Sequence, residues 1–326
     1  MTNRTLSFED ILYGVGHGRM QSVGHMGVVP LVDEGDAEDD YFEAPNLRVG
    51  NRNYGNVDLD HQGNGPTIVP PGAGWVVRQS AQDHAIGSGV LMRGGEHRNI
   101  DTAFCIEESQ GGYISQGDHD MLVLPAAMRT QALAMRNERE FGKLWESIRQ
   151  FNRSCGVSQS GGHLVYFLRQ FEKELDEFVA EFELVPRQVG AIILIGGRVV
   201  GIERAPTVAF WERLWVPLVR VCYGSMAIQA AKLGLDPAPR VGLDLENPSL
   251  DGLMAAMQRA NARAEENTNE LVTSIKGKLL GVSPTAEDRL DAAKLLTVAT
   301  PSQQPEFAGQ LVEREGRYPY LSLVTA

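Results

Sequence analysis

The 326-residue sequence has only three cysteines, few aromatic residues (7%) and no lysine before Lys143. The cysteines form no C-x-x-C pair, which excludes zinc-knuckle spacing and gives no sign of a disulfide framework. No uninterrupted apolar stretch reaches the length of a membrane span, because the most apolar segment, 208–231, contains Glu212, Arg213 and Arg220. We therefore expect free thiols and no membrane partner.

The sequence also has fewer basic than acidic residues. The chain has 30 basic residues against 42 acidic residues, for a net charge of −12. Residues 1–125 alone carry 7 arginines, no lysine and 18 acidic residues, so nearly all of the excess charge lies there. Binding to a nucleic-acid backbone relies on a basic surface, so we expect no such partner. The acidic part is instead a candidate contact face for a basic partner.

The usual short signatures of catalysis are missing as well. There is no P-loop, no G-x-S-x-G and no H-E-x-x-H, and the run Gly14-Val-Gly-His-Gly18 lacks the last glycine of a dinucleotide loop. The first twelve residues lack the basic and apolar regions of a secretory signal. We expect a cytoplasmic protein, or a component of a virion assembled in the cytoplasm.

The patterns that are present indicate an α+β fold. A glycine-rich N-terminal arm without regular structure is expected over 1–27, and a β-rich, acidic region over 28–125. Residues 126–326 are predicted to be a helix-rich α+β region, packed with 28–125 as one unit. This gives a β-rich N-terminal half and a helix-rich C-terminal half with a central β-hairpin.

Several elements can be placed within the C-terminal half. Two β-branched runs around Gly196-Gly197 predict the hairpin, over 189–202. Thr207 is a candidate N-cap for a helix through Leu233, which Pro217 should kink or split. Further helices are expected over 126–151, 163–184, 250–266, 269–280 and 285–298. A C-terminal strand, 318–324, is predicted to rejoin a sheet beside the hairpin.

One stretch has the spacing of a metal loop. Asp58, Asp60 and Gln62 supply oxygen donors at the first, third and fifth positions of a calcium loop. The closing position is Val69 rather than glutamate, so the bidentate ligand is absent. A bound Ca²⁺ is a weak alternative here, and a turn in a solvated loop is favoured.

Several segments, in order, resemble the family of proteins associated with ADP-ribosylglycohydrolase and rhodanese-phosphatase, with bacterial and phage members. They are Val28-Val-Pro-Leu31, Asn46-Leu-Arg-Val-Gly-Asn51, Cys105-Ile-Glu107, the hairpin over 189–202 and Tyr320-Leu-Ser-Leu323. The family's Lys-Gln-Asn-Arg-like segment falls near Gln79–His84, where only Gln82 clearly matches. The resemblance implies ADP-ribose or nucleotide-linked biology by association.

Two main hypotheses follow. The first, which we favour, is a non-catalytic binding or structural assembly protein, such as a phage virion component, which forms homo- or hetero-oligomers and needs no cofactor. The alternative is an enzyme or sensor for a nucleotide such as ADP-ribose. In it, Cys105, Glu107 and His84 are the catalytic candidates, and Gln79, Gln82 and Asp83 are the ligand-binding candidates. A metal-binding protein is a weaker third possibility.

Overall fold

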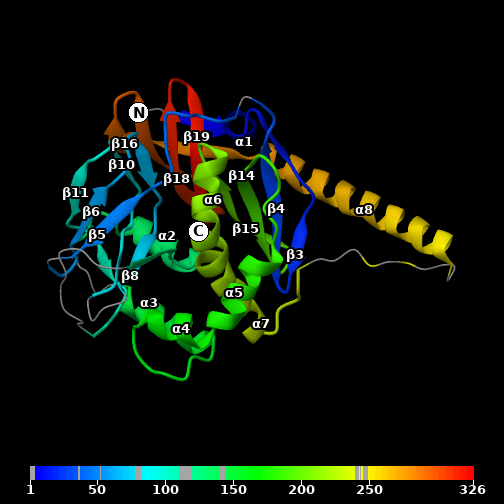
Figure 1. Ribbon diagram of the computed structural model, residues 1–326, viewed down its shortest axis with the longest axis horizontal. Coiled ribbons are helices and arrows are strands. Elements are labelled where there is room, and N and C mark those ends of the chain that lie inside the picture. The colour runs from blue at the N-terminus through cyan, green and yellow to red at the C-terminus, as the bar shows by residue number, and fades with distance from the viewer. Residues whose placement is uncertain are drawn as a thin grey trace.

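The computed structural model describes residues 4–35, 37–51, 53–77, 82–109, 119–139, 144–238, 242, 244 and 249–326. It is a mixed α+β structure, as predicted, built around a ten-stranded sheet (Figure 1). The strands of this sheet are β1 (Arg4–Ser7), β2 (Val15–His17), β3 (Gln21–Val23), β4 (Met26–Asp33), β14 (Gln188–Ile195), β15 (Arg198–Arg204), β16 (Leu279–Leu290), β17 (Ala293–Ala299), β18 (Phe307–Arg314) and β19 (Arg317–Thr325). They run in the order β1-β16-β17-β18-β19-β15-β14-β4-β2, and β3 also pairs with β4.

Three smaller sheets stand beside the large one, at the left of Figure 1. The first contains β5 (Leu47–Gly50), β6 (Val57–His61) and β11 (His97–Ile100). The second pairs β7 (Thr67–Val69) with β10 (Val90–Met92). The third contains β8 (Ala73–Val77), β9 (His84–Ala85), β12 (Phe104–Cys105) and β13 (His119–Val123). They share a small core of their own around the fully buried Trp75.

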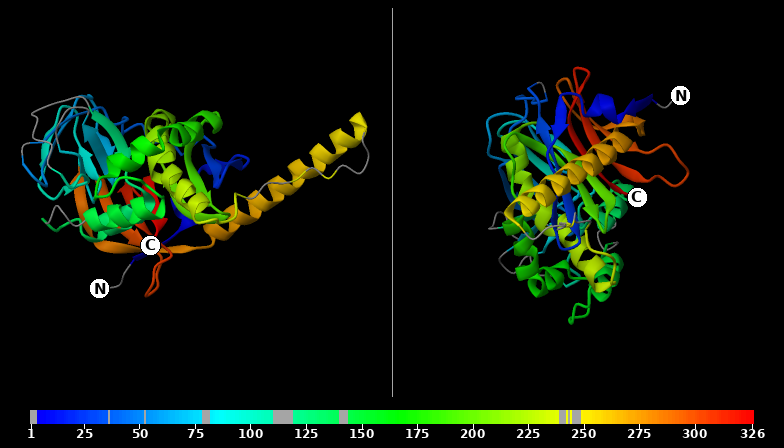
Figure 2. Two further views of the ribbon diagram at one scale, coloured as in Figure 1. Left: turned by 90° about the horizontal axis from the view of Figure 1, so that it is seen from below. Right: turned by 90° about the vertical axis from the view of Figure 1, so that its right-hand side faces the viewer.

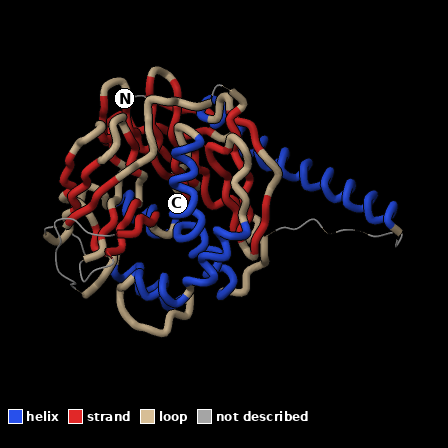
Figure 3. The backbone as a smooth tube through the Cα atoms, in the orientation of Figure 1, coloured by secondary structure: helices blue, strands red, loops and turns tan. Residues whose placement is uncertain are grey.

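The helices are separated from the strands in Figure 3, most of them in the lower part of the view. They are α1 (Phe8–Ile11), α2 (Ala126–Ala134), α3 (Trp145–Ser154), α4 (Leu164–Gln170), α5 (Glu172–Glu181), α6 (Val208–Val216), the π-helix η1 (Pro217–Tyr223), α7 (Gly224–Lys232) and α8 (Leu250–Lys276). Both faces of the large sheet are buried at its central strand β14. Ile193 belongs to the hydrophobic cluster that includes α6 and α7, whereas its neighbour Leu194 belongs to the cluster that includes α1 and the end of α8.

The local signals in the central part of the chain are confirmed. Gly196 and Gly197 form the hairpin turn with φ of 55° and 78°, values that favour glycine. The Thr207 hydroxyl accepts a hydrogen bond from the Phe210 amide and caps α6. Pro217, which cannot donate to the helical ladder, stands where α6 gives way to η1. The C-terminal strand β19 pairs with β15, as expected.

Other helix predictions are wrong. Residues 285–298 belong to the strands β16 and β17, which turn at Asp291. Their alanine- and leucine-rich composition favours a helix locally, but pairing within the sheet overrides that preference. The two helices expected over 250–266 and 269–280 are one continuous helix, α8, which ends at Lys276. The helix-rich half therefore also supplies six strands of the large sheet.

The expectation of an irregular arm over 1–27 is also wrong. β2 and β3 pair with β4, and β1 pairs with β16 from the far end of the chain. The acidic run 33–43, which begins at the last residue of β4 and has the composition of a solvated loop, is partly buried. Asp33 is buried and ion-paired with Arg187, and Asp39 is buried and ion-paired with Arg314. Part of the negative charge is therefore used inside the chain and is unavailable to a partner.

Candidate functional site

The β9–β12 pair brings a thiol and an imidazole together. Cys105 and His84 are register partners on these two short strands, and Cys105 Sγ lies 3.4 Å from His84 Nε2. His84 Nδ1 lies 3.0 Å from the Gln82 carbonyl oxygen, so the Nδ1-protonated tautomer donates to that carbonyl. Nε2 is then an acceptor for the thiol. Four of the six sequence candidates converge here, because the Gln82 side chain also donates to the Glu107 carbonyl at 3.0 Å.

Burial keeps this pair neutral. Cys105 is fully buried, and this raises the pKa of its thiol to about 11. Burial likewise lowers the pKa of His84 to about 4. A reactive cysteine needs the opposite shift, toward thiolate at neutral pH. The arrangement is therefore a hydrogen-bonded thiol and a neutral imidazole, and no activated nucleophile forms.

There is also little room beside the pair. The void next to it, lined by Asn51, Trp75, Gln82 and His84 among others, has a volume of about 10 Å³. That is space for about one water molecule. The Asn51 side chain donates to the Gln82 carbonyl at 2.6 Å and closes the cluster from another side. A nucleotide cannot enter this space in the conformation observed.

Three candidate groups remain to be placed: Gln79, Asp83 and the side chain of Glu107, whose carbonyl accepts from Gln82. Gln79 lies outside the described residues, and Asp83 is buried next to Gln82, with its carbonyl accepting from the Ile106 amide. Glu107 is partly buried, which raises its pKa against the opposing effects of His163 and Arg169. Its carboxylate lies 3.9 Å from His163 Nδ1, so the carboxylate–histidine contact at this place does not involve His84.

The calcium-loop residues adopt an extended conformation. Asp58 and Asp60 lie on β6, which pairs with β5 on one side and β11 on the other, so they do not curl around a cation. The Asp58 carboxylate instead accepts from Asn99 at 2.8 Å, and Gln62 donates to the Asp60 carbonyl. The favoured turn in a solvated loop is equally absent. Within the described parts of the chain, no three His, Cys, Asp or Glu side chains are placed to hold a metal ion.

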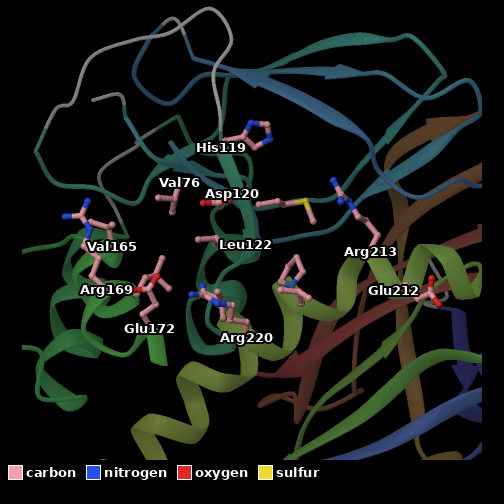
Figure 4. A pocket seen from close by; sticks show the side chains of 15 residues that line it. Val76, His119, Asp120, Leu122, Val165, Arg169, Glu172, Glu212, Arg213 and Arg220 are labelled. Atoms are coloured by element: carbon pink, nitrogen blue, oxygen red, sulfur yellow. The ribbon is translucent and has the colours of Figure 1, made fainter. Parts of the chain in front are cut away.

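A much larger opening adjoins the β8–β13 pair. We call it the groove, and its volume is about 740 Å³ (Figure 4). Its lining comes from β8 and β13 on one side and from α4, α5, α6 and η1 on the other. The apolar lining residues are Val76, Met121, Leu122, Val165, Leu168, Val216, Pro217 and Val221. His119 lines both the groove and the small void beside Cys105, so the two sites adjoin.

Three arginines from three helical segments surround this apolar lining: Arg169 of α4, Arg213 of α6 and Arg220 of η1. Arg220 is held by Asp176, whose carboxylate accepts from its Nε at 2.5 Å. Arg169 and Arg213 are exposed and form no ion pair within the described parts of the chain. Asp120, Glu172 and Glu212 also line the groove, and Glu212 points away from its centre in Figure 4.

Little in the sequence predicts the groove. Its arginines lie up to 51 positions apart and belong to no local motif. The single local hint is Pro217, which was expected to disturb a helix and in fact starts a π-helix in the groove wall. Such π-helical turns are rare and recur at functional sites.

Comparison with known families agrees with the resemblance inferred from the motifs. Residues 14–297 match the model of the ARG and Rhodanese-Phosphatase-superfamily-associated Protein domain. The match covers most of the chain, which therefore belongs to this family. No curated protein and no solved structure matches it.

Proposed function

We propose that this family member acts by binding rather than by catalysis, and that its groove takes a ligand that joins an anionic group to a flat apolar part. The observation that carries the proposal is the pairing of an apolar lining with Arg213 and Arg169, two guanidinium groups with no ion pair among the described residues. Guanidinium groups bind phosphate and carboxylate through paired hydrogen bonds. The volume is in the usual range for small-molecule sites, about 300–1,000 Å³.

A nucleotide such as ADP-ribose has this combination of groups, and the family association makes it the first ligand to try. Its adenine would lie on the apolar lining and its diphosphate near Arg213. The sealed, neutral Cys105–His84 pair beside the groove supports binding over turnover. Catalysis at that pair would need a thiolate, which burial opposes.

Arg213→Ala tests the groove. It should weaken binding of ADP-ribose about tenfold or more, because a hydrogen bond to a charged group contributes about 1.5–3 kcal/mol. Isothermal titration calorimetry with ADP-ribose, adenosine and ribose measures this. Arg198→Ala, an exposed arginine at the hairpin outside the groove, is the matched control and should bind like the wild type. Equal affinity of the Arg213→Ala variant, or no binding by the wild type, would show that the groove is not the site.

A second candidate function, assembly with other subunits, is favoured by α8. This 27-residue helix extends away from the rest of the molecule in both Figure 1 and Figure 2. Near its C-terminal end Val272 and Ile275 are buried against the body. Toward its N-terminal end an apolar stripe at helical spacing is exposed: Leu250 (73%), Leu253 (36%), Met254 (53%) and Met257 (49%).

We propose that a second copy of this chain covers the stripe, because two such helices side by side would bury the same side chains on both copies. Whether the resulting assembly is a phage virion stays a prediction. No helix among the described residues is long and apolar enough to cross a membrane, so α8 is not proposed as an anchor.

Charges placed in the stripe should break the assembly. The double variant Leu253→Glu/Met257→Glu is expected to elute as a monomer, whereas the wild type should have at least twice the monomer mass by light scattering. Ala262→Glu/Asn269→Glu adds the same charge at exposed positions of α8 away from the stripe and should leave the mass unchanged. A wild type that is monomeric at high micromolar concentration would rule out self-association through α8.

A further inference from the structure

The groove contains an acidic residue that binding of an anion does not explain. Glu172, the first residue of α5, lines the groove and is exposed. In the parts of the chain that the structure describes, its carboxylate takes part in no hydrogen bond and no ion pair. Asp120 already interacts with another residue, and Glu212 points away from the centre of the groove in Figure 4. A free carboxylate weakens anion binding unless it meets a hydrogen-bond donor of the ligand.

The charges of the groove are unevenly distributed. Figure 4 shows Arg169 and Glu172 toward one side of the groove and Arg213 toward the other, with apolar lining residues between them. The charge of Arg169 also acts on a second carboxylate: burial raises the pKa of Glu107, and His163 and Arg169 oppose that rise. One guanidinium group therefore stands near two carboxylates on this side. The Arg213 side attracts an anion, whereas the Glu172 side favours a hydrogen-bond donor.

Glu172 also has a structural role, which it shares with Glu174. Both residues lie in the first turn of α5, where a negative charge interacts favourably with the helix dipole. Glu174 is exposed as well, but it does not line the groove. The helix dipole therefore accounts for an acid at either position, and only Glu172 is also placed to contact a ligand.

We infer that Glu172 determines which base the groove accepts, and that its carboxylate accepts a hydrogen bond from the 6-amino group of adenine. This inference rests on the proposed binding of ADP-ribose in the groove. With the diphosphate near Arg213 and the adenine on the apolar lining, the edge of the base farthest from the diphosphate lies toward Glu172. That edge carries the 6-amino donor beside the N1 acceptor, and Arg169 supplies donors for N1.

Loss of this hydrogen bond should weaken binding of the ligand. A carboxylate that gives up water and then faces a carbon-bound hydrogen has lost its partner, so a site built to bond an N–H group rejects an analogue that lacks one. Because Glu172 and Arg213 lie toward opposite sides of the groove, they contact different parts of the ligand. Base selection and anion binding are therefore separate contributions to affinity, and each can be measured without the other.

Calorimetric titration of the full chain with two ligands tests this inference. The ligands are ADP-ribose and its purine analogue, in which a hydrogen atom replaces the 6-amino group. The wild type should bind ADP-ribose about tenfold more tightly, as expected for a hydrogen bond to a charged group. Glu172→Met should bind both ligands equally, and Glu172→Gln, whose amide oxygen still accepts, should retain a smaller preference. The ratio of the two affinities is the measured quantity, because both variants also remove a charge that repels the diphosphate.

Glu174→Met is the matched control for the change in α5. It removes the same charge from the same helical turn outside the groove, so its affinity ratio should equal that of the wild type. Equal binding of the two ligands by the wild type, or an unchanged ratio in Glu172→Met, would overturn the inference. If ADP-ribose still binds and Arg213→Ala weakens it, the proposed function stands and only the role of Glu172 falls. A wild type that does not bind ADP-ribose would reject both.

Discussion

Arg129→Met is expected to lower the free energy of unfolding by about 3–5 kcal/mol, because it leaves a buried carboxylate without its cation. Arg129 of α2 and Glu203 of β15 are 4% and 3% exposed, and Arg129 Nη1 lies 2.7 Å from Glu203 Oε1. Burial alone would lower the pKa of Arg129, but Glu203 raises it well above its ordinary value, so the pair stays ionised. Urea unfolding followed by circular dichroism measures the loss.

The Glu203 carboxylate has two further hydrogen-bond partners, and they determine which control variant is suitable. The hydroxyls of Tyr223 and Ser322 both donate to it, at 2.6 Å each. The double variant Arg129→Met/Glu203→Gln removes both charges but keeps an acceptor for these hydroxyls. It should therefore recover a large part of the stability that Arg129→Met loses, since a neutral buried amide costs less than an unpaired charge. Additive losses in the double variant would contradict this account of the network.

Gly190→Ala should have the second-largest effect. A Cβ at Gly190, on the central strand β14, would stand 2.2 Å from the Glu203 carbonyl oxygen and 3.1 Å from the Cα of Arg204. Both are backbone atoms of the paired strand, so relief requires the strands to move apart. Overpacking of a tight core typically costs about 1–3 kcal/mol, and we expect about 3 kcal/mol here because no flexible side chain can give way.

Gly281→Ala is the matched control for this steric argument. Gly281 is also a strand glycine of the large sheet, but its added Cβ would meet the nearest atom, the Ala299 carbonyl oxygen, at an ordinary 3.5 Å. Its stability should stay within about 1 kcal/mol of the wild type, because the alanine also restricts the unfolded chain. Similar losses in the two variants, measured by urea unfolding, would mean that glycine flexibility, and not the close approach of β15, sets the cost.

The predictions for Arg129 and Gly190 concern contacts that no local sequence pattern predicts. Arg129 lies in a segment that the sequence predicts to be helical, but its partner Glu203 lies 74 positions away, on a strand. Likewise, Gly190 looks like any glycine in an apolar run. Glycine is required at this position because β15 packs closely against β14. The register of β14 is also irregular near Gln188. The stability of the central sheet therefore depends on long-range placement.

The candidate site, too, was predicted from the sequence only in part. Cys105 and Glu107 were singled out together with Gln82 and His84, and the pairing of β9 with β12 does bring them to one place. Their chemistry could not be read from their identity, since burial decides whether a thiol is reactive. The groove was missed entirely, because Arg169, Arg213 and Arg220 become neighbours only when α4, α6 and η1 pack.

The sequence by itself determined the features whose cause lies within a few residues. The hairpin at Gly196-Gly197 follows from turn geometry, the start of α6 from the Thr207 cap, and the end of α6 from Pro217. It also determined the α+β class and the family. Tertiary structure alone decided that residues 285–298 belong to two paired strands and that β1, β2 and β3, within residues 4–27, join the large sheet. The pairing of β1 with β16 shows the reason, since its hydrogen bonds come from a partner far along the chain. Burial by distant residues likewise decided which charges are paired, and it raises the pKa of the Cys105 thiol.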